Sequence, residues 1–311
     1  MPIKIANDLP VKGILEDENI FVMDDTRALH QDIRPLDICI LNLMPLKEDT
    51  ELQILRMLSN TPLQVNVSFL TTSTHEAKHT SRSHLNKFYD VFDDIKDNYY
   101  DGFIITGAPI ETLEFEDVDY WPEMEKIFEW TKTHVTSTLH LCWGAQAGLY
   151  YHYGIEKKFL PEKLFGVFAH RVQHRRVPLV RGFDDYFMAP HSRYTESDAD
   201  EIKQNSDLIV LSDSPEAGVF LVMNNDGSRV FVMGHPEYDR MTLDKEYRRD
   251  LSEGMKQHKP VNYYPNDDEN MKPMLQWRGH ANTFYTNWLN YYVYQNTPFI
   301  FLGKDEKNER H

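Results

Sequence analysis

The sequence has few cysteines, lacks long apolar runs and has no excess of basic charge, and each shortage excludes a class of protein. Its two cysteines, Cys39 and Cys142, argue against a disulfide scaffold and a zinc site. No apolar stretch approaches the length of a membrane-spanning helix, and the first residues lack the apolar segment of a signal peptide. We therefore expect a cytoplasmic protein that does not bind a membrane.

The charge balance argues against nucleic acid as a partner. The formal net charge is −16 at pH 7, whereas binding to phosphates needs a concentrated basic face. Basic side chains gather locally at residues 170–176. We interpret this segment as a solvated strand edge, and a local site for an anionic cofactor is the alternative.

The distribution of apolar residues predicts an α/β fold. With 41% hydrophobic and 26% charged residues, the chain has the composition of a globular protein. Apolar strand patterns at residues 36–43, 63–69, 102–106 and 135–141 alternate with helix patterns, which is typical of a mostly parallel sheet with helices on both faces. Short strands follow at residues 208–211, 219–223 and 229–233, then a helix at 243–256 and an aromatic helical stripe at 281–292 that we expect to pack in the core.

We expect one domain over residues 1–311, because the sequence has no internal repeat and no shift in composition that would mark a linker. The charged tail at residues 304–311 is expected to be frayed.

The most informative motif surrounds Cys142. A buried-strand pattern over 135–141 precedes it, and a helix pattern over 145–153 follows it and ends at Gly154. The small residues Gly144 and Ala145 allow the close approach that a nucleophile elbow requires. A thiol in such a turn lies at the positive end of a helix, where a thiolate is favoured. Cys39 has apolar neighbours on both sides and is expected to lie in the core.

A base for this thiol is present downstream. His235 follows an apolar strand, Pro236 prevents that strand from continuing, and Glu237 can hold the imidazole by one ring nitrogen. The carboxyl ends of parallel strands meet at one edge of a sheet, so we expect this pair to lie beside Cys142. The backbone N–H groups of Trp143 and of the Gly107–Ala108 turn would form the oxyanion hole, and the set supports acyl transfer through a thioester.

The sequence resembles a known enzyme family over essentially its whole length. The motifs that carry the resemblance are Asn42-Leu43-Met44-Pro45, Thr106-Gly107-Ala108-Pro109, residues 140–146, residues 234–239 and Arg278-Gly279-His280-Ala281-Asn282. Together they are similar to the homoserine O-acyltransferases of methionine biosynthesis that have a cysteine nucleophile. This resemblance implies a fold like that of class I glutamine amidotransferases, which is flavodoxin-like.

The resemblance also implies the chemistry. The donor would be an acyl-CoA, the acceptor L-homoserine, and the path ping-pong through an acyl-cysteine, with no resident cofactor. Cys142 would be the nucleophile, His235 the general base and Glu237 its partner. The substrate-binding positions of the family correspond to Lys163, Ser192 and Arg249. A guanidinium such as that of Arg249 suits the carboxylate of an amino acid.

The acyl donor depends on one position in this family, which carries glycine or glutamate. Here it is Glu111, directly after the proposed oxyanion turn. A carboxylate there would exclude the carboxylate of a succinyl group, so we expect acetyl-CoA, and a homoserine O-succinyltransferase is the alternative. A glutamine amidotransferase or γ-glutamyl hydrolase, or a binding protein that keeps the fold, are more distant alternatives. The sequence leaves the oligomeric state open, a homodimer included.

Overall fold

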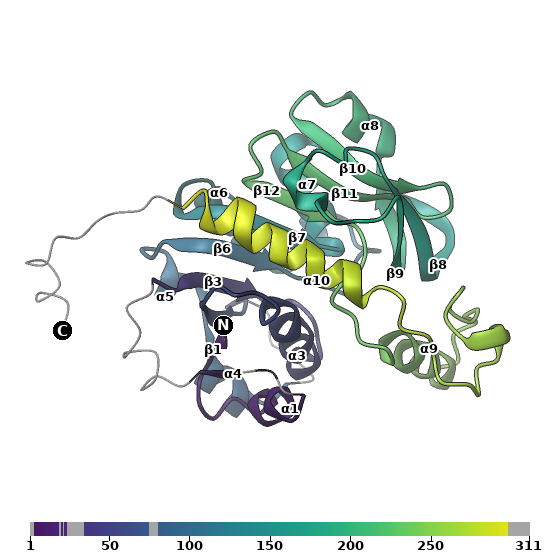
Figure 1. Cartoon of the computed structure of the whole chain (residues 1–311), viewed down its shortest axis with the longest axis horizontal. Coiled ribbons are helices and arrows are strands. Elements are labelled where there is room, and N and C mark those ends of the chain that lie inside the picture. The colour runs from purple at the N-terminus through teal and green to yellow at the C-terminus, as the bar shows by residue number, and fades with distance from the viewer. Residues whose placement is uncertain (1–2, 19, 21, 24–33, 75–79, 298–311) are drawn as a thin grey trace, which may run out of the picture.

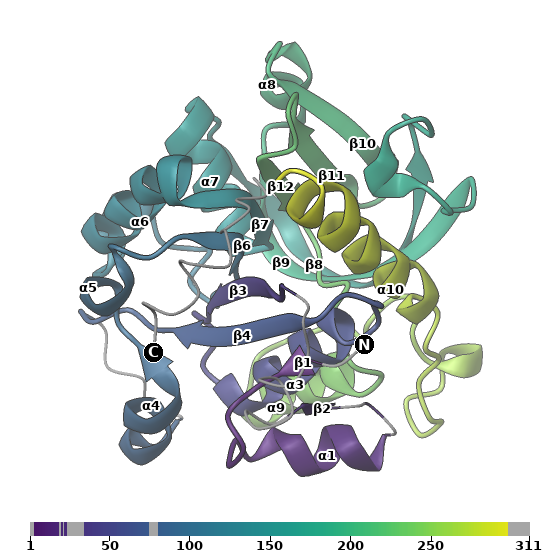
Figure 2. The same cartoon turned by 60° about the vertical axis from the view of Figure 1, so that its left-hand side comes forward.

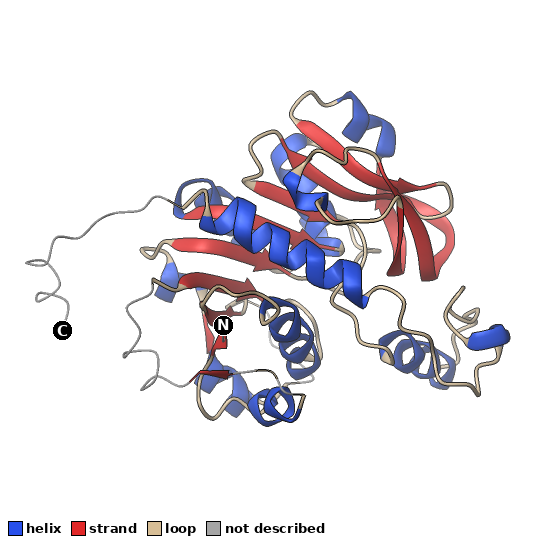
Figure 3. Ribbon diagram, viewed as in Figure 1, coloured by secondary structure: helices blue, strands red, loops and turns tan. Residues whose placement is uncertain are grey.

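A computed structural model describes residues 3–18, 20, 22–23, 34–74 and 80–297. The predicted frayed tail at 304–311 therefore lies outside the described residues. Twelve strands of the described part form one sheet (Figure 3). Their bounds are β1 (Ile3–Lys4), β2 (Val22–Met23), β3 (Leu36–Leu41), β4 (Val65–Leu70), β5 (Tyr89–Asp90), β6 (Tyr100–Ile105), β7 (Val135–Leu141), β8 (Lys157–Val172), β9 (Tyr186–Ser197), β10 (Leu208–Ser214), β11 (Gly218–Asn224) and β12 (Arg229–Val232).

The sheet is parallel on one side and antiparallel on the other. Its order is β2-β1-β4-β3-β6-β7-β12-β11-β10-β8-β9, with β5 beside β4. Neighbouring strands are parallel from β2 to β12, and antiparallel from β12 through β11, β10 and β8 to β9. Figure 2 shows β4, β3, β6 and β7 side by side, with the antiparallel strands beyond them. The predicted α/β class with a mostly parallel sheet is confirmed.

Helices cover both faces of the parallel part. In Figure 1, α10 runs across one face in front of β6 and β7. The helices are α1 (Val11–Asp17), α3 (Lys47–Leu58), α4 (Arg82–Phe88), α5 (Phe92–Ile95), α6 (Trp121–His134), α7 (Trp143–Tyr153), α8 (Ala199–Gln204), α9 (Thr242–Ser252) and α10 (Arg278–Asn287). Three short 3₁₀ turns (Phe115–Asp117, Pro178–Val180 and Pro265–Asp267) and a π-helical continuation of α10 (Trp288–Tyr294) complete the described elements.

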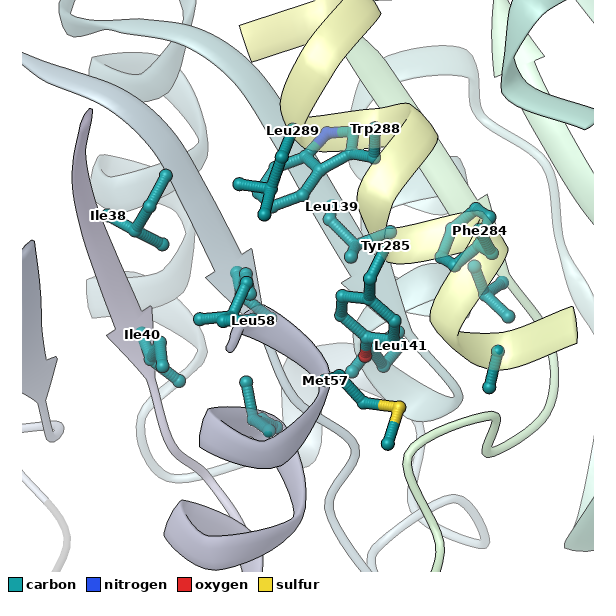
Figure 4. Close-up of a cluster of buried hydrophobic side chains, with 14 of the residues drawn as sticks. Ile38, Ile40, Met57, Leu58, Leu139, Leu141, Phe284, Tyr285, Trp288 and Leu289 are labelled. Carbon is teal, nitrogen blue, oxygen red and sulfur yellow. The ribbon is translucent and has the colours of Figure 1, made fainter. Parts of the chain in front are cut away.

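The alternation of side chains along the central strands explains this layering. On β3, Ile38 and Ile40 contact the cluster formed with α3 and α10, whereas Cys39 and Leu41 contact the cluster formed with α6 and α7. β3 is apolar and buried at every position from Ile38 to Leu41, which suits a sheet buried on both faces. Figure 4 shows the first cluster, in which the predicted aromatic stripe of α10 and its continuation packs over Ile38 and Leu139. Cys39 is buried as expected, and burial raises the pKa of its thiol to about 12.

The second half has the predicted short strands and, in addition, a strand pair that the sequence analysis did not predict. The long strands β8 and β9 form an antiparallel pair that the pattern of short strands does not include. Apolar residues do not alternate regularly along β8. Pro161 lies within the strand, and the pairing with β9 shifts register between Phe159 and Leu164. Only residues 170–172 of the basic segment lie in a strand, and β8 is not an edge strand, because it lies between β9 and β10. Arg171 and residues 173–176 are exposed, as expected for a solvated segment, whereas His170 is fully buried.

Within the described ranges, no helix combines the length and the apolar character that a membrane span requires.

Buried histidines make the fold sensitive to acid. Burial lowers the pKa of both His140 and His170 to about 3. In the unfolded chain these groups titrate near ~6.5, so the unfolded state takes up protons first as the pH falls. The two histidines therefore contribute fully to the free energy of unfolding above pH ~6.5. This contribution is lost as the pH falls from there toward 3, at up to about 1.4 kcal/mol per pH unit for each histidine.

We expect His140→Phe to reduce the loss of unfolding free energy between pH 7 and pH 5, because one buried group no longer takes up a proton on unfolding. The ring of Phe would keep the stacking on Phe231. Denaturant unfolding at a series of pH values measures this slope. His174→Phe, at an exposed position, is the control and should leave it unchanged. An equal slope in His140→Phe would contradict the assignment of the acid sensitivity to this site.

Candidate active site

Cys142 occupies the single-residue turn between β7 and α7, as the sequence predicts for an elbow. Its backbone has φ 49° and ψ −114°, an unusual conformation for a residue with a side chain. The N–H of Cys142 donates to Val232 O of β12 at 2.7 Å, which ties the turn to the neighbouring strand. The side chain is 8% exposed. Backbone strain of this kind persists only where the surroundings hold it in place, and it is common at functional sites.

Two glycines let the surrounding backbone approach this turn. A Cβ on Gly144, in the first turn of α7, would lie 2.6 Å from the carbonyl oxygen of Thr106. A Cβ on Gly107 would lie 3.2 Å from Cys142 Cβ and 3.3 Å from His235 Cε1. The turn after β6 therefore lies in direct contact with the cysteine and the histidine.

His235 follows β12 and is held by Glu237. Its Nδ1 lies 2.8 Å from Glu237 Oε1, and both side chains are buried. Burial alone would lower the pKa of His235, but the negative charges of Cys142 and Glu237 outweigh it and raise the pKa well above its ordinary value. The arrangement therefore favours the imidazolium form of His235. His235 and Glu237 thus lie in contact, as the sequence predicts for this pair, and their roles as base and orienting group stay a prediction.

The face of the imidazole is covered by Tyr238. The two rings stack with centroids 4.0 Å apart and planes 16° apart. The Tyr238 hydroxyl donates to Glu246 Oε1 of α9 at 2.8 Å. This contact connects α9 to the histidine and restricts the ring to one plane.

A buried carboxylate joins two of the cations that the resemblance selects. Lys163 Nζ of β8 donates to Asp250 Oδ2 at 2.9 Å, and Arg249 Nη2 donates to Asp250 Oδ1 at 2.6 Å. Asp250 is 1% exposed, whereas half of the Arg249 side chain is exposed. Lys163 also lies over the ring of Phe165, with 4.4 Å from Nζ to the ring centroid. Asp250 therefore fixes both cations relative to α9.

Glu111 faces the same site and is half-buried. Burial raises the pKa of its carboxyl, and the nearby positive charges of Lys163 and His235 oppose that rise. Ser192 of β9 lies opposite Phe165 of β8 in the sheet, so its side chain shares a face with the ring under Lys163.

The residues predicted to form an oxyanion hole lie next to Cys142, and their role as donors stays a prediction. Trp143 begins α7, so its N–H has no carbonyl partner within the helix. The Gly107–Ala108 turn lies across from it, against Cys142. Across the described part of the chain, no cluster of three His, Cys, Asp or Glu side chains could hold a metal ion.

The sequence did not predict three residues that hold the cations and the histidine of the site, directly or through another residue. Two of them are acids on the highly charged helix α9, Glu246 and Asp250, and the third is Tyr238, just before that helix. Their neighbours in the sequence give no sign of their contacts. The hydrogen bond to Lys163 and the stacking on His235 exist because α9 packs against β8 and the turn after β12.

Comparison with solved structures shows which class of fold this protein has. A solved glutamine amidotransferase of Thermotoga maritima matches with a TM-score of 0.57 and 12% identity, over 84% of this chain and 99% of that one. A glutamine amidotransferase of Methylobacillus flagellatus matches with a TM-score of 0.54 and 12% identity, over 88% of this chain and all of that one. At this identity the likeness shows the fold alone, which is the predicted class I glutamine amidotransferase-like fold.

Sequence comparison shows the family. Residues 2–299 match the family model described as homoserine O-succinyltransferase, so the chain belongs to that family. It is 67% identical over 306 residues to a homoserine O-acetyltransferase of Agathobacter rectalis, covering 98% of this chain and 99% of that one. A homoserine O-acetyltransferase of Geobacillus kaustophilus is 60% identical over 299 residues, covering 96% and 99%. The predicted membership of the homoserine O-acyltransferases is confirmed.

We expect Gly107→Ala to lower the rate of acyl transfer at least about tenfold, a barrier increase of about 1.4 kcal/mol. The added methyl group would press on Cys142 and His235 and displace the oxyanion turn. Steady-state kinetics and the melting temperature measure the effect. Gly279→Ala is the matched control, because nothing lies within 4 Å of its added Cβ. Full activity of Gly107→Ala would show that this turn does not border the reacting atoms.

Proposed function

We propose that this protein transfers the acetyl group of acetyl-CoA to the hydroxyl of L-homoserine, giving O-acetyl-L-homoserine and CoA. The observation that carries the proposal is the 67% identity over nearly the whole chain to a protein named homoserine O-acetyltransferase. The buried Cys142, His235 and Glu237 supply a nucleophile, a base and an orienting group for such a transfer. Support for glutamine amidotransferase chemistry is limited to the fold.

In the first half-reaction, the Cys142 thiolate attacks the carbonyl carbon of the thioester. The oxyanion that forms would accept hydrogen bonds from the N–H of Trp143 and from the Gly107–Ala108 turn. The bond between the acetyl carbon and the CoA sulfur then breaks, and the CoA thiolate takes the proton of the His235 imidazolium. The products are free CoA and an acetylated cysteine.

In the second half-reaction, neutral His235 accepts the proton of the homoserine hydroxyl while the oxygen attacks the acetyl carbon. The carbon–sulfur bond to Cys142 breaks, which restores the thiolate and the imidazolium. The cations Lys163 and Arg249, joined through Asp250, would bind the acceptor carboxylate. Ser192, on the same sheet face, would add a hydroxyl to this subsite.

The choice of acetyl over succinyl would rest on Glu111. Its carboxyl group lies close enough to Lys163 and His235 for their charges to affect its pKa. A succinyl group on Cys142 would bring a second carboxylate into the same space, which like-charge repulsion opposes.

We further propose that residues 1–311 act as one catalytic domain in the cytoplasm, with acetyl-CoA as a cosubstrate and without a resident cofactor. The single sheet through the described residues supports one domain, because strands from both halves of the chain supply the site. Two free, buried cysteines fit a reducing compartment.

Cys142→Ser is expected to abolish acetyl transfer, because the serine hydroxyl is not ionised at neutral pH and forms no nucleophile comparable to the thiolate. Intact mass spectrometry after exposure to acetyl-CoA alone should show one acetyl adduct in the wild type and none in the variant. Cys39→Ser is the control and should retain both adduct and turnover. An acetyl adduct that survives in Cys142→Ser would exclude this cysteine as the nucleophile.

Glu111→Gly is expected to shift donor preference toward succinyl-CoA. Two like charges ~5 Å apart at an effective dielectric near ~20 repel by roughly 3 kcal/mol, which is about a hundredfold in discrimination. The ratio of kcat/KM for the two donors in wild type and variant measures the shift. Glu114→Gly, at an exposed position in the same acidic stretch, should leave the ratio unchanged. A wild type that prefers succinyl-CoA, or a ratio that Glu111→Gly does not change, would overturn the donor assignment.

A further inference from the structure

A cavity of about 340 Å³ lies at the carboxyl ends of three parallel strands. Its walls are Asn42–Pro45 after β3, Thr71 and Thr72 after β4, and Ala108–Ile110 after β6. The volume is within the range of small-molecule sites, about 300–1,000 Å³. This edge of a parallel sheet is also where α/β proteins bind their ligands.

The cavity adjoins the nucleophile through the oxyanion turn. Ala108 lines it, and the preceding residue, Gly107, lies against Cys142 and His235. In the sheet, β6 is the neighbour of β7, whose end carries Cys142. A molecule in the cavity would therefore lie one turn of backbone away from Cys142.

The cations of the site lie on the other side of Cys142. Lys163 is on β8, beyond β12 in the sheet, and shares Asp250 with Arg249 of α9, whereas the cavity lies over β4, β3 and β6. A ping-pong enzyme must bind the acyl donor and then the acceptor beside one cysteine. The cavity lies on one side of β7 and the cations lie on the other, so the donor and the acceptor can each have a separate subsite.

We propose that the cavity binds the pantetheine arm of the acyl donor, an inference that rests on the proposed acetyl-CoA reaction. The arm is uncharged and combines methyl and methylene groups with two amides. The lining matches this mixture, with apolar side chains from Leu43, Met44 and Ile110 and hydroxyls from Thr71 and Thr72. Charged side chains of both signs also line the cavity, namely Lys47, Asp117 and Asp119, so the match to the arm rests on the uncharged part of the lining.

Thr71→Trp tests the proposal by filling the cavity from the β4 side, away from the oxyanion turn. The readout is the rate of Cys142 acetylation with two donors, acetyl-CoA and p-nitrophenyl acetate, which has no pantetheine arm. We expect the KM for acetyl-CoA to rise at least about tenfold, while acetylation by p-nitrophenyl acetate and the KM for homoserine change less than about twofold. Thr133→Trp, on the exposed surface of α6, is the matched control and should change none of these rates.

Each other outcome contradicts the proposal. An unchanged KM for acetyl-CoA would place the arm elsewhere, and a rise in the KM for homoserine would make this the acceptor site. Equal slowing with both donors would mean that the substitution acts on the catalytic turn. Leu113→Trp, from the opposite wall, repeats the test if Thr71→Trp does not fold. Failure of the proposed function is distinguishable, because the wild type would then not be acetylated by acetyl-CoA at all.

Discussion

The rest of the site depends on one constraint, the passage of the chain from β7 to α7 through Cys142 alone. The backbone of Cys142 adopts a conformation that costs of order 1–3 kcal/mol in a residue with a side chain. Packing of the fully buried Trp143 and the approach of Gly144 to Thr106 hold the turn in this state. Because the turn is so short, the thiol, the first amides of α7 and the turn after β6 are forced into one small volume.

The position of β7 in the sheet explains why both halves of the chain contribute residues to the site. β7 pairs with β6 on one side and β12 on the other, so the oxyanion turn and His235 reach Cys142 from opposite sides. Beyond β12 the sheet becomes antiparallel, and the long β8–β9 pair together with α9 carries the cations. The parallel strands thus supply the cavity and the nucleophile, β12 at the boundary supplies the base, and β8 with α9 supplies the proposed acceptor subsite.

Charges in this site are buried in compensated groups. Asp250 lies between Lys163 and Arg249, and the His235 imidazole lies between Cys142 and Glu237. A buried charge without a partner would cost several kcal/mol, so each group depends on its neighbours. This dependence also fixes geometry, because the partners of each cation limit where a substrate carboxylate could bind.

The sequence by itself determined the parallel core, the elbow around Cys142 and the family. These features depend on local signals, namely continuous apolar strands, a small-residue turn after the cysteine and short motifs with defined residue types. Tertiary structure alone decided the β8–β9 pair, the burial of His170 and the contacts of Asp250 and Tyr238. These depend on packing between segments far apart in the chain, such as Lys163 and Asp250, and no local pattern of residues specifies which distant partner a side chain will contact.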